Sequence, residues 1–278
     1  NWITDFRPEN GNEFIDWTYG LSDISSYLDL FNQVKLPNTF GYENTPKASK
    51  SANVVNNEGG FSMLVEGEPF YMKGICYNTG HDWEEGFIPL TRNQIAGDFI
   101  KIKAMGANTI RRYEPSIYDW NIFKEAEDKG LKIMYGFWFD PKTDYLKDKD
   151  KLAAYEKKVL SNVRKNIDQE SIIAWSIGNE TWGLLKKHYG QPYLTVLRRE
   201  YVKFLENLAQ KIHKIDPNRP VFSSEEHDNI RLLGAIHDFK NYAPSIDVIG
   251  INSYYDENIS ALDEIFTRTD SNRPYTIT

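Results

Sequence analysis

Cysteine is nearly missing from this chain of 278 residues, in which Cys76 is the single example. One thiol excludes an internal disulfide, so a small fold held together by disulfides is ruled out and the redox compartment stays open. No apolar run approaches the roughly 20 residues that a membrane-spanning helix needs. The sequence therefore predicts a globular fold that rests on its own core, with no membrane-spanning segment.

Motifs of several common enzyme classes are absent as well. The chain has no phosphate-binding loop and no Gly-x-Ser-x-Gly turn, which argues against a nucleotidase and a serine esterase. Its five His residues show no HxH or HExxH spacing. We therefore expect no protein-bound metal and no cofactor.

Positive charge is scarce, because 33 Lys and Arg stand against 40 Asp and Glu, for a net charge of −7. A polyanion binds to a basic surface, so nucleic acid is not an expected partner. Hydrophobic residues make up 40% of the chain and charged residues 26%, which are the proportions of an ordinary globular domain.

Aromatic residues are abundant instead. The chain holds 7 Trp, 17 Tyr and 15 Phe, or 14% of all residues. Flat rings with polar tips suit the apolar faces and hydroxyl rims of sugars, although a large barrel core also uses many rings.

The first 58 residues differ from the rest of the chain. They carry clusters of Asn, Pro, Ser and Glu, for example at 7–10, 36–38 and 45–47, with short apolar patches between them. The chain also begins with Asn1 and shows no signal peptide. We therefore expect a processed or excised chain in which residues 1–58 are a loop-rich extension or the tail of an upstream domain. The compartment stays open, with an extracytoplasmic or secreted location favoured.

From residue 59 to residue 278, strand patterns alternate with helix patterns. A turn at 66–68 joins two short strands, and a capping box of Thr91 and Gln94 begins a helix over 91–105. The longest helix pattern covers 193–215. The seven main strand segments are 70–77, 108–114, 132–139, 172–180, 220–224, 247–254 and 274–278.

This alternation is typical of parallel βα units in an α/β protein, and seven repeats favour a (β/α)8 TIM barrel. A doubly wound open sheet gives the same alternation, but its usual Gly-rich first turn is missing. The last strand stops at Thr278, so we expect residues 59–278 to be a barrel whose last βα unit is missing or incomplete.

The strand at 172–180 carries the clearest functional signal. Its residues up to Ile177 are too apolar for an edge strand and fit a strand that is buried on both faces. Asn179 and Glu180 follow where the strand stops. The carboxyl ends of barrel strands form the reaction face, so Glu180 is a candidate catalytic residue. The alternative is a Glu that caps the next helix or pairs with an Arg.

Polar and aromatic side chains gather at the other predicted strand ends. They are His81, Asp82, Arg111, Arg112, Glu114, Trp138, Asp140, Trp182, Glu225, Glu226, His227, Asn252, Tyr254 and Tyr255. Such a set of carboxylates, amides and rings suits cleavage of a glycosidic bond. In that reaction one carboxylic acid protonates the leaving oxygen, and a second carboxylate attacks the sugar or activates water.

Simpler roles compete with these functional ones. Arg112 faces the opposite side of its strand from Arg111, which favours an ion pair with a helix. Trp138 and Trp182 either stack on sugars or pack, whereas Trp175 and Cys76 are expected in the core.

Glu225 and Glu226 are rivals for the second carboxylate. If one of them faced Glu180 across a gap that holds a water molecule, the enzyme would be inverting. Side-by-side acids at a strand end more often cap a helix, and this role is preferred here.

Four motifs together resemble the catalytic barrel of clan A glycoside hydrolases. They are Asn108–Arg111, Ile177–Glu180, Asp247–Tyr254 and Arg273–Thr278. The resemblance is strongest to the family two barrel of β-galactosidases, β-glucuronidases and β-mannosidases. It extends in part to fungal β-1,3-glucanosyltransferases, and it covers about residues 60–278.

The resemblance implies roles for individual residues. Glu180 would be the general acid/base, and Asn179 would hydrogen-bond the sugar 2-hydroxyl. Arg111 and Tyr254 would hold a nucleophilic Glu at the end of the last strand, and Asn252 matches the Asn of the family's Asn-x-Tyr. That nucleophile directly follows the segment that ends at Thr278 here, so we expect it as the next residue of the intact protein and no retaining hydrolysis by the chain as given.

The expected function is thus retaining hydrolysis of β-linked glycosides, with an oligo- or polysaccharide as partner and with further domains in the full-length protein. Two alternatives stay open: a transglycosylase that uses the same site, and a non-catalytic carbohydrate-binding barrel. Specificity for one sugar depends on loops such as 78–90, 140–150 and 182–192, and the sequence of these loops does not identify the sugar.

Overall fold

The structure is a computed structural model, and it describes residues 52–57, 60–78, 90–254 and 261–278. The chain divides into two units, Asn1–Ala48 and Ser49–Thr278. All described residues belong to the second unit.

Parallel strands form the main sheet, in the order β10-β9-β8-β7-β6-β5-β4. They are β4 (Gly74–Cys76), β5 (Thr109–Arg111), β6 (Lys132–Phe137), β7 (Ile172–Asn179), β8 (Val221–Glu226), β9 (Val248–Asn252) and β10 (Tyr275–Ile277). Strands that are neighbours in the sheet are also neighbours in the sequence. A doubly wound sheet reverses its order at a switch point, whereas this unreversed order is that of a (β/α)8 barrel. The predicted TIM-barrel fold is confirmed, with seven of its strands in the described residues.

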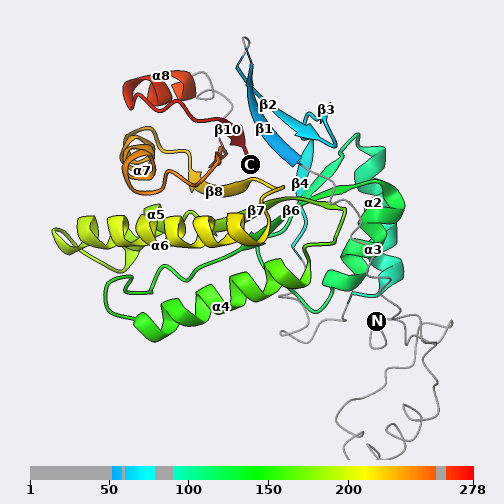
Figure 1. The fold of residues 1–278 in the computed structure, drawn as a ribbon, viewed down its shortest axis with the longest axis horizontal. Helices are drawn as coiled ribbons and strands as arrows, with labels where there is room; N and C mark the ends of the chain where they lie inside the picture. Colours follow the sequence, from blue (N-terminus) through cyan, green and yellow to red (C-terminus); the bar gives the residue numbers. More distant parts are fainter. Residues whose placement is uncertain (1–51, 58–59, 79–89, 255–260) are drawn as a thin grey trace, which may run out of the picture. The chain divides into compact units, whose positions relative to one another are not determined.

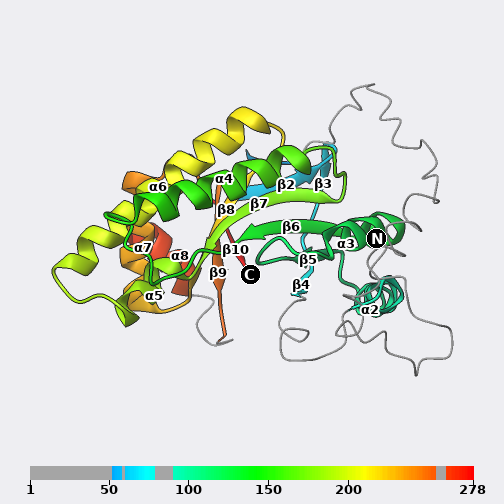
Figure 2. The same ribbon diagram turned by 90° about the horizontal axis from the view of Figure 1, so that it is seen from below.

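Helices cover the sheet in the same sequence as the strands (Figures 1 and 2). They are α2 (Arg92–Ala104), α3 (Asp119–Lys129), α4 (Lys149–Lys165), α6 (Tyr193–Ile215), α7 (Asn229–Tyr242) and α8 (Ala261–Arg268), with a short α5 (Thr181–Leu184) and a 3-10 turn η2 (Leu185–Lys187). The pairs α2–α3, α4–α6, α6–α7 and α7–α8 contact each other. Figure 2 shows α4 and α6 along one side of β6 and β7.

Local sequence signals account for the helix ends. Thr91 is the N-cap of α2, where its hydroxyl accepts from the Gln94 backbone N–H at 3.2 Å and its own N–H donates to Gln94 Oε1 at 2.9 Å. This is the predicted capping box. The helix α6 ends at Ile215, directly before the Asp216-Pro217 pair, because a proline cannot continue the backbone ladder.

Two apolar clusters lie on the two faces of the sheet. The larger one fills the space between sheet and helices, and it holds Trp175, which is fully buried as expected. The indole N–H of Trp175 donates to Asp216 Oδ2 at 2.8 Å, so its one polar atom is satisfied. The smaller cluster fills the barrel interior and consists of Met134, Ala174, Phe222 and Val248.

A small antiparallel sheet covers the amino ends of the barrel strands. It consists of β1 (Ala52–Asn57), β2 (Gly60–Val65) and β3 (Glu68–Pro69). Ala52 and Val65 pack on Ile173 at the start of β7, and Val54 packs against the interior cluster. The sequence pattern placed 52–57 in a loop-rich extension, whereas the structure pairs this segment with β2. Polar residues hide the strand pattern, since three of the six residues of β1 are Asn and two of them, Asn53 and Asn56, are exposed.

The described sheet has β4 and β10 at its two edges. Cys76 lies on β4 and is exposed. The expectation that this thiol is buried in the core is therefore wrong, because an edge strand lacks a neighbour that would cover it. In the part of the chain that the structure describes, no helix combines the length and the apolar character needed to cross a bilayer.

Gly136 on β6 provides a stability test. A Cβ atom at this position would lie 2.0 Å from the backbone oxygen of Arg112, and a backbone atom cannot move aside as a side chain can. We expect Gly136→Ala to lower the free energy of unfolding by about 3 kcal/mol in denaturant titrations. The matched control is Gly97→Ala in α2, where a Cβ meets nothing within 4 Å. It should leave stability unchanged or raise it by up to about 1 kcal/mol. Equal effects of the two substitutions would contradict this packing.

Candidate active site

Three strand ends meet through the guanidinium of Arg111 on β5. Its Nη1 donates to Asn252 Oδ1 and its Nη2 donates to Asn179 Oδ1, both at 2.8 Å. Asn252 Nδ2 also donates to Asn179 Oδ1 at 2.9 Å. Arg111 is only 6% exposed, and its guanidinium lies 5.0 Å from the centre of the Tyr113 ring. These contacts join β5, β7 and β9 at their carboxyl ends.

Glu180 is bound to the same network through one of its oxygens. Its Oε1 accepts from Asn252 Nδ2 at 2.6 Å and from the Tyr254 hydroxyl at 3.2 Å. Tyr254 is 68% exposed, so it lies at the open side of the site. Desolvation and the nearby Glu180 carboxylate raise the pKa of Tyr254, which keeps its hydroxyl protonated as a donor.

A sharp turn of the backbone brings Glu180 to this place. Gly178 and Glu180 both have positive φ values, of 78° and 56°, and the pairing of β7 with β8 shifts register between Ser176 and Asn179. At Gly178 a Cβ atom would lie 2.1 Å from the Tyr201 hydroxyl, so only glycine fits there. The Glu180 N–H donates to Ser224 O at 2.8 Å, which anchors the turn to β8.

The end of β10 also reaches the network. The Thr278 hydroxyl donates to Asn252 Oδ1 at 2.7 Å, and its backbone N–H donates to Ile251 O at 2.8 Å. Sequence reasoning missed this role of Thr278. The available signal was a hydroxyl residue at a strand end that shares its rim with Asn252.

Glu225 faces the backbone that follows Glu180. It is 2% exposed, and its Oε1 and Oε2 accept from the N–H groups of Trp182 and Gly183, each at 3.3 Å. Burial raises the pKa of Glu225 to about 8, with a smaller contribution from the Glu180 charge. Both oxygens are directed to the start of α5, which disfavours the inverting alternative. Glu226 instead pairs with Arg231 at 3.2 Å.

The two tryptophans for which stacking on a sugar and packing were both open have different surroundings. Trp182 is buried, with its indole N–H donating to Asp238 Oδ2 at 2.9 Å and the Arg198 guanidinium 3.7 Å from its ring centre. These are the contacts of a packing residue, which is one of the two roles that the sequence left open for Trp182. Trp138 follows β6 and is 40% exposed, so its ring has an open face.

Other predicted residues lie outside the network. Arg112 bonds the Tyr77 carbonyl at 2.8 Å and pairs with Asp119 at the start of α3 at 3.5 Å, as its strand position predicted. Two carboxylates form ion pairs at the surface: Glu114 with Lys158 and Asp140 with Lys151. His81, Asp82 and Tyr255 lie outside the described residues.

His227 on the connection after β8 supports the segment that carries the site. Its Nδ1 lies 2.8 Å from Ser253 Oγ, and its backbone N–H donates to Asn252 O at 3.0 Å. It therefore braces the end of β9 between Asn252 and Tyr254.

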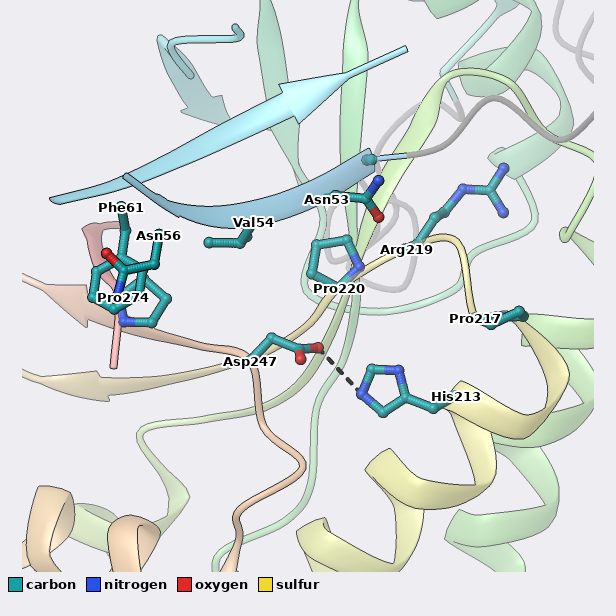
Figure 3. A pocket seen from close by; sticks show the side chains of 11 residues that line it. Asn53, Val54, Asn56, Phe61, His213, Pro217, Arg219, Pro220, Asp247 and Pro274 are labelled. Carbon is teal, nitrogen blue, oxygen red and sulfur yellow. Dashed lines mark ion pairs between the residues drawn. The ribbon is translucent and has the colours of Figure 1, made fainter. Parts of the chain in front are cut away.

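A cavity of about 280 Å³ lies at the opposite end of the strands (Figure 3). Its lining includes Pro220 and Pro274, which directly precede β8 and β10, and residues of β1. Across it His213 pairs with Asp247 at 3.2 Å, and Asp247 also accepts from the Val221 N–H at 2.7 Å. These charged groups are satisfied by the protein itself, so the cavity is no part of the candidate site.

The chain belongs to glycosyl hydrolase family 2, because the model of the family's TIM barrel domain matches residues 58–277. Among curated relatives, it is 22% identical to a β-glucuronidase of Canis lupus familiaris in an alignment of 271 residues that covers 90% of this chain and 35% of that protein. The chain thus spans about a third of the length of this relative.

Solved structures share the fold. A β-D-glucuronidase of Dictyoglomus thermophilum superposes with a TM-score of 0.58 at 18% identity, over 81% of this chain and 38% of that one. A family 2 β-galacturonidase of Eisenbergiella tayi bound to galacturonate gives a TM-score of 0.59 at 18% identity, over 82% and 38% of the two chains.

The network makes a prediction for Asn252, whose side chain bonds Arg111, Asn179, Glu180 and Thr278. Asn252→Ala leaves the buried Arg111 guanidinium without one of its acceptors. We therefore expect the free energy of unfolding to fall by about 2–4 kcal/mol in denaturant titrations. The control Tyr254→Phe removes one hydrogen bond at an exposed position and should change it by less than ~0.5 kcal/mol. A neutral Asn252→Ala would argue against a buried network.

The Glu225 carboxyl should make stability depend on pH, because its pKa is about 8 in the folded chain against an ordinary 4.5. Between these values the folded protein keeps a proton that the unfolded chain has released. Stability should therefore fall as pH rises, by about 1.4 kcal/mol per pH unit from this group, and the slope should end above about pH 8.

We expect Glu225→Gln to remove this part of the slope, as measured by denaturant unfolding at a series of pH values. Glu226→Gln, on the same strand but with a half-exposed side chain, should retain it. Identical slopes in the Glu225→Gln variant and the unmodified protein would show that Glu225 ionises normally.

Proposed function

We propose that the intact protein is a retaining hydrolase of β-linked glycosides in which Glu180 is the general acid/base. The observation that carries this proposal is the convergence of Arg111, Asn179, Glu180, Asn252 and Tyr254 at one end of the barrel. Membership of glycosyl hydrolase family 2 supports the same conclusion. The site also lies at the carboxyl ends of the strands, where TIM-barrel enzymes carry out their chemistry.

The two oxygens of Glu180 have different surroundings that suit an acid. Oε1 accepts hydrogen bonds from Asn252 and Tyr254, which fixes the orientation of the carboxyl group. Oε2 is then the oxygen that carries the proton and gives it to the leaving glycosidic oxygen. In the second half of the reaction, the same group takes a proton from the attacking water.

Asn179 is oriented for a sugar hydroxyl. Its Oδ1 accepts from both Arg111 and Asn252, so the amide cannot rotate freely. Its NH2 group is left to donate to the substrate, in line with the contact to the 2-hydroxyl that the family resemblance implies. Such a hydrogen bond strengthens as charge develops on the sugar in the transition state.

We propose a Glu directly after Thr278 as the nucleophile. The contact between Thr278 and Asn252, which also bonds Glu180, supports a location of the next residue close to the acid. Retention needs two carboxyl groups about 5–5.5 Å apart. The nucleophile would attack the anomeric carbon while the bond to the leaving oxygen breaks, and water would then release the sugar. The Arg111 charge would favour the ionised form of the nucleophile.

The substrate class follows from the relatives by analogy. Two of them are called β-glucuronidases and one a β-galacturonidase bound to galacturonate, so aryl β-uronides are the first substrates to test. Aryl β-galactosides and β-mannosides complete the panel, because family membership alone does not select the sugar.

Substitution of Glu180 tests the acid role in the full-length protein. Glu180→Gln should lower kcat/KM by about 10³-fold on a substrate with a poor leaving group, because that oxygen needs a proton in the transition state. The glycosylation step of an activated aryl glycoside should slow less, since its leaving group departs without taking up a proton. The measurement compares initial rates on an alkyl glycoside and on a dinitrophenyl glycoside of the same sugar.

Glu226→Gln is the matched control and should retain activity on both substrates. Equal losses on both substrates in Glu180→Gln would contradict the acid role. The anomer formed first, followed by NMR, distinguishes the mechanisms, because a first product of inverted configuration excludes retention.

A further inference from the structure

We infer that Glu225 is a positioning residue that holds Glu180 in its functional orientation by accepting hydrogen bonds from the backbone at the start of α5. This inference rests on the proposed function for its kinetic consequence, whereas its structural consequence can be measured without any activity. Glu225 acts through the backbone of Trp182 and Gly183 and not on the substrate.

The first observation is the backbone of Glu180 itself. Its φ of 56° lies in the left-handed region, which residues other than glycine rarely adopt. Such a conformation persists only where the surrounding contacts fix it. Gly178, two residues earlier, is also left-handed, a conformation that glycine adopts without steric cost.

Two consecutive residues of β8 supply the missing restraint. Ser224 O accepts from the Glu180 N–H at 2.8 Å, and the Glu225 carboxyl accepts from the N–H groups of Trp182 and Gly183 at 3.3 Å each. The turn is thus held before and after the Glu180 side chain by the same strand. The Leu184 N–H donates back to Glu180 O at 2.8 Å, so α5 transmits this restraint to Glu180.

A second layer fixes Trp182 behind the turn. Arg198 on α6 lies over the ring and donates from Nε to the Trp182 carbonyl at 3.0 Å, while Asp238 on α7 accepts from the indole N–H. The helices α6 and α7 therefore hold the side chain of Trp182, and β8 holds its amide. Loss of Glu225 frees the amides without removing the side-chain anchor.

The charged groups around Glu225 come from two further elements. Glu180 at the end of β7 opposes its ionisation, and Arg198 on α6 favours it. Tyr201 on α6 also faces it, with a pKa raised by burial and by the Glu225 charge. Burial dominates among these effects and raises the pKa of Glu225 to about 8.

Hydrogen–deuterium exchange of the full-length protein tests the hydrogen bonds to Glu225 directly. In Glu225→Ala, the amides of Trp182 and Gly183 should exchange at least about tenfold faster than in the unmodified protein, because they lose their acceptors. Glu226→Ala removes the adjacent carboxylate and should leave both rates unchanged. Unaltered protection of these amides in a folded Glu225→Ala variant overturns the inference.

Glu225→Gln provides a second variant in case the alanine variant does not fold. It keeps one acceptor oxygen and replaces the other by an NH2 group. One of the two amides should therefore keep its protection while the other exchanges faster. Full protection of both amides in a folded Glu225→Gln variant overturns the inference.

Steady-state kinetics test whether the hydrogen bonds of Glu225 contribute to catalysis. In Glu225→Ala we expect kcat to fall by about tenfold or more with KM within about twofold, because substrate contacts survive while the acid is misplaced. Glu225→Gln should recover most of kcat. Unchanged kcat with increased exchange would overturn the positioning role.

Absence of glycosidase activity in the unmodified protein would instead count against the proposed function. The exchange result would still decide whether Glu225 holds the turn.

Discussion

The hydrogen bonds of Arg111 to two asparagine side chains are the interaction on which the site depends. A buried guanidinium is costly unless its donors are satisfied, and here neutral amide oxygens of Asn179 and Asn252 satisfy two of them. Among the ion pairs of the described residues none involves Arg111, so its positive charge is not cancelled there. The same arrangement that binds three strands together therefore leaves a site that attracts an anion. Glu180 is held next to this charge through Asn252 and not by Arg111 itself.

Different contacts hold the side chain of Glu180 and the main chain of its turn. At the side chain, the amide of Asn252 and the hydroxyl of Tyr254 donate to its Oε1. In the main chain, the backbone oxygen of Ser224 and the carboxyl of Glu225 hold the turn by accepting from its N–H groups. A strained residue with two independent sets of contacts can stay in one orientation while a substrate binds and leaves. This division also explains why so much buried polar structure surrounds one short helix.

Most of the fold and part of the site could be predicted from the sequence. Alternating apolar segments gave the strands in their order, and capping signals at Thr91 and Asp216 gave helix ends, because these patterns are local. Strand ends brought Arg111, Asn179, Glu180 and Asn252 into one group for the same reason. Burial of Trp182, exposure of Cys76 and the partner of Glu225 depend on which distant elements cover each position. A single sequence carries no local signal for such contacts, and the polar residues of β1 concealed its strand.

The interior cluster of Met134, Ala174, Phe222 and Val248 separates two polar regions of the barrel. One is the rim with Glu180, and the other is the amino-end cavity with His213 and Asp247 beneath β1. Four apolar side chains, one each from β6, β7, β8 and β9, lie between them, so substitutions under β1 should leave the chemistry at the rim undisturbed. For protein engineering this means that thermal resistance can be improved at the base of the barrel, and substrate preference altered at the rim, as two nearly independent tasks.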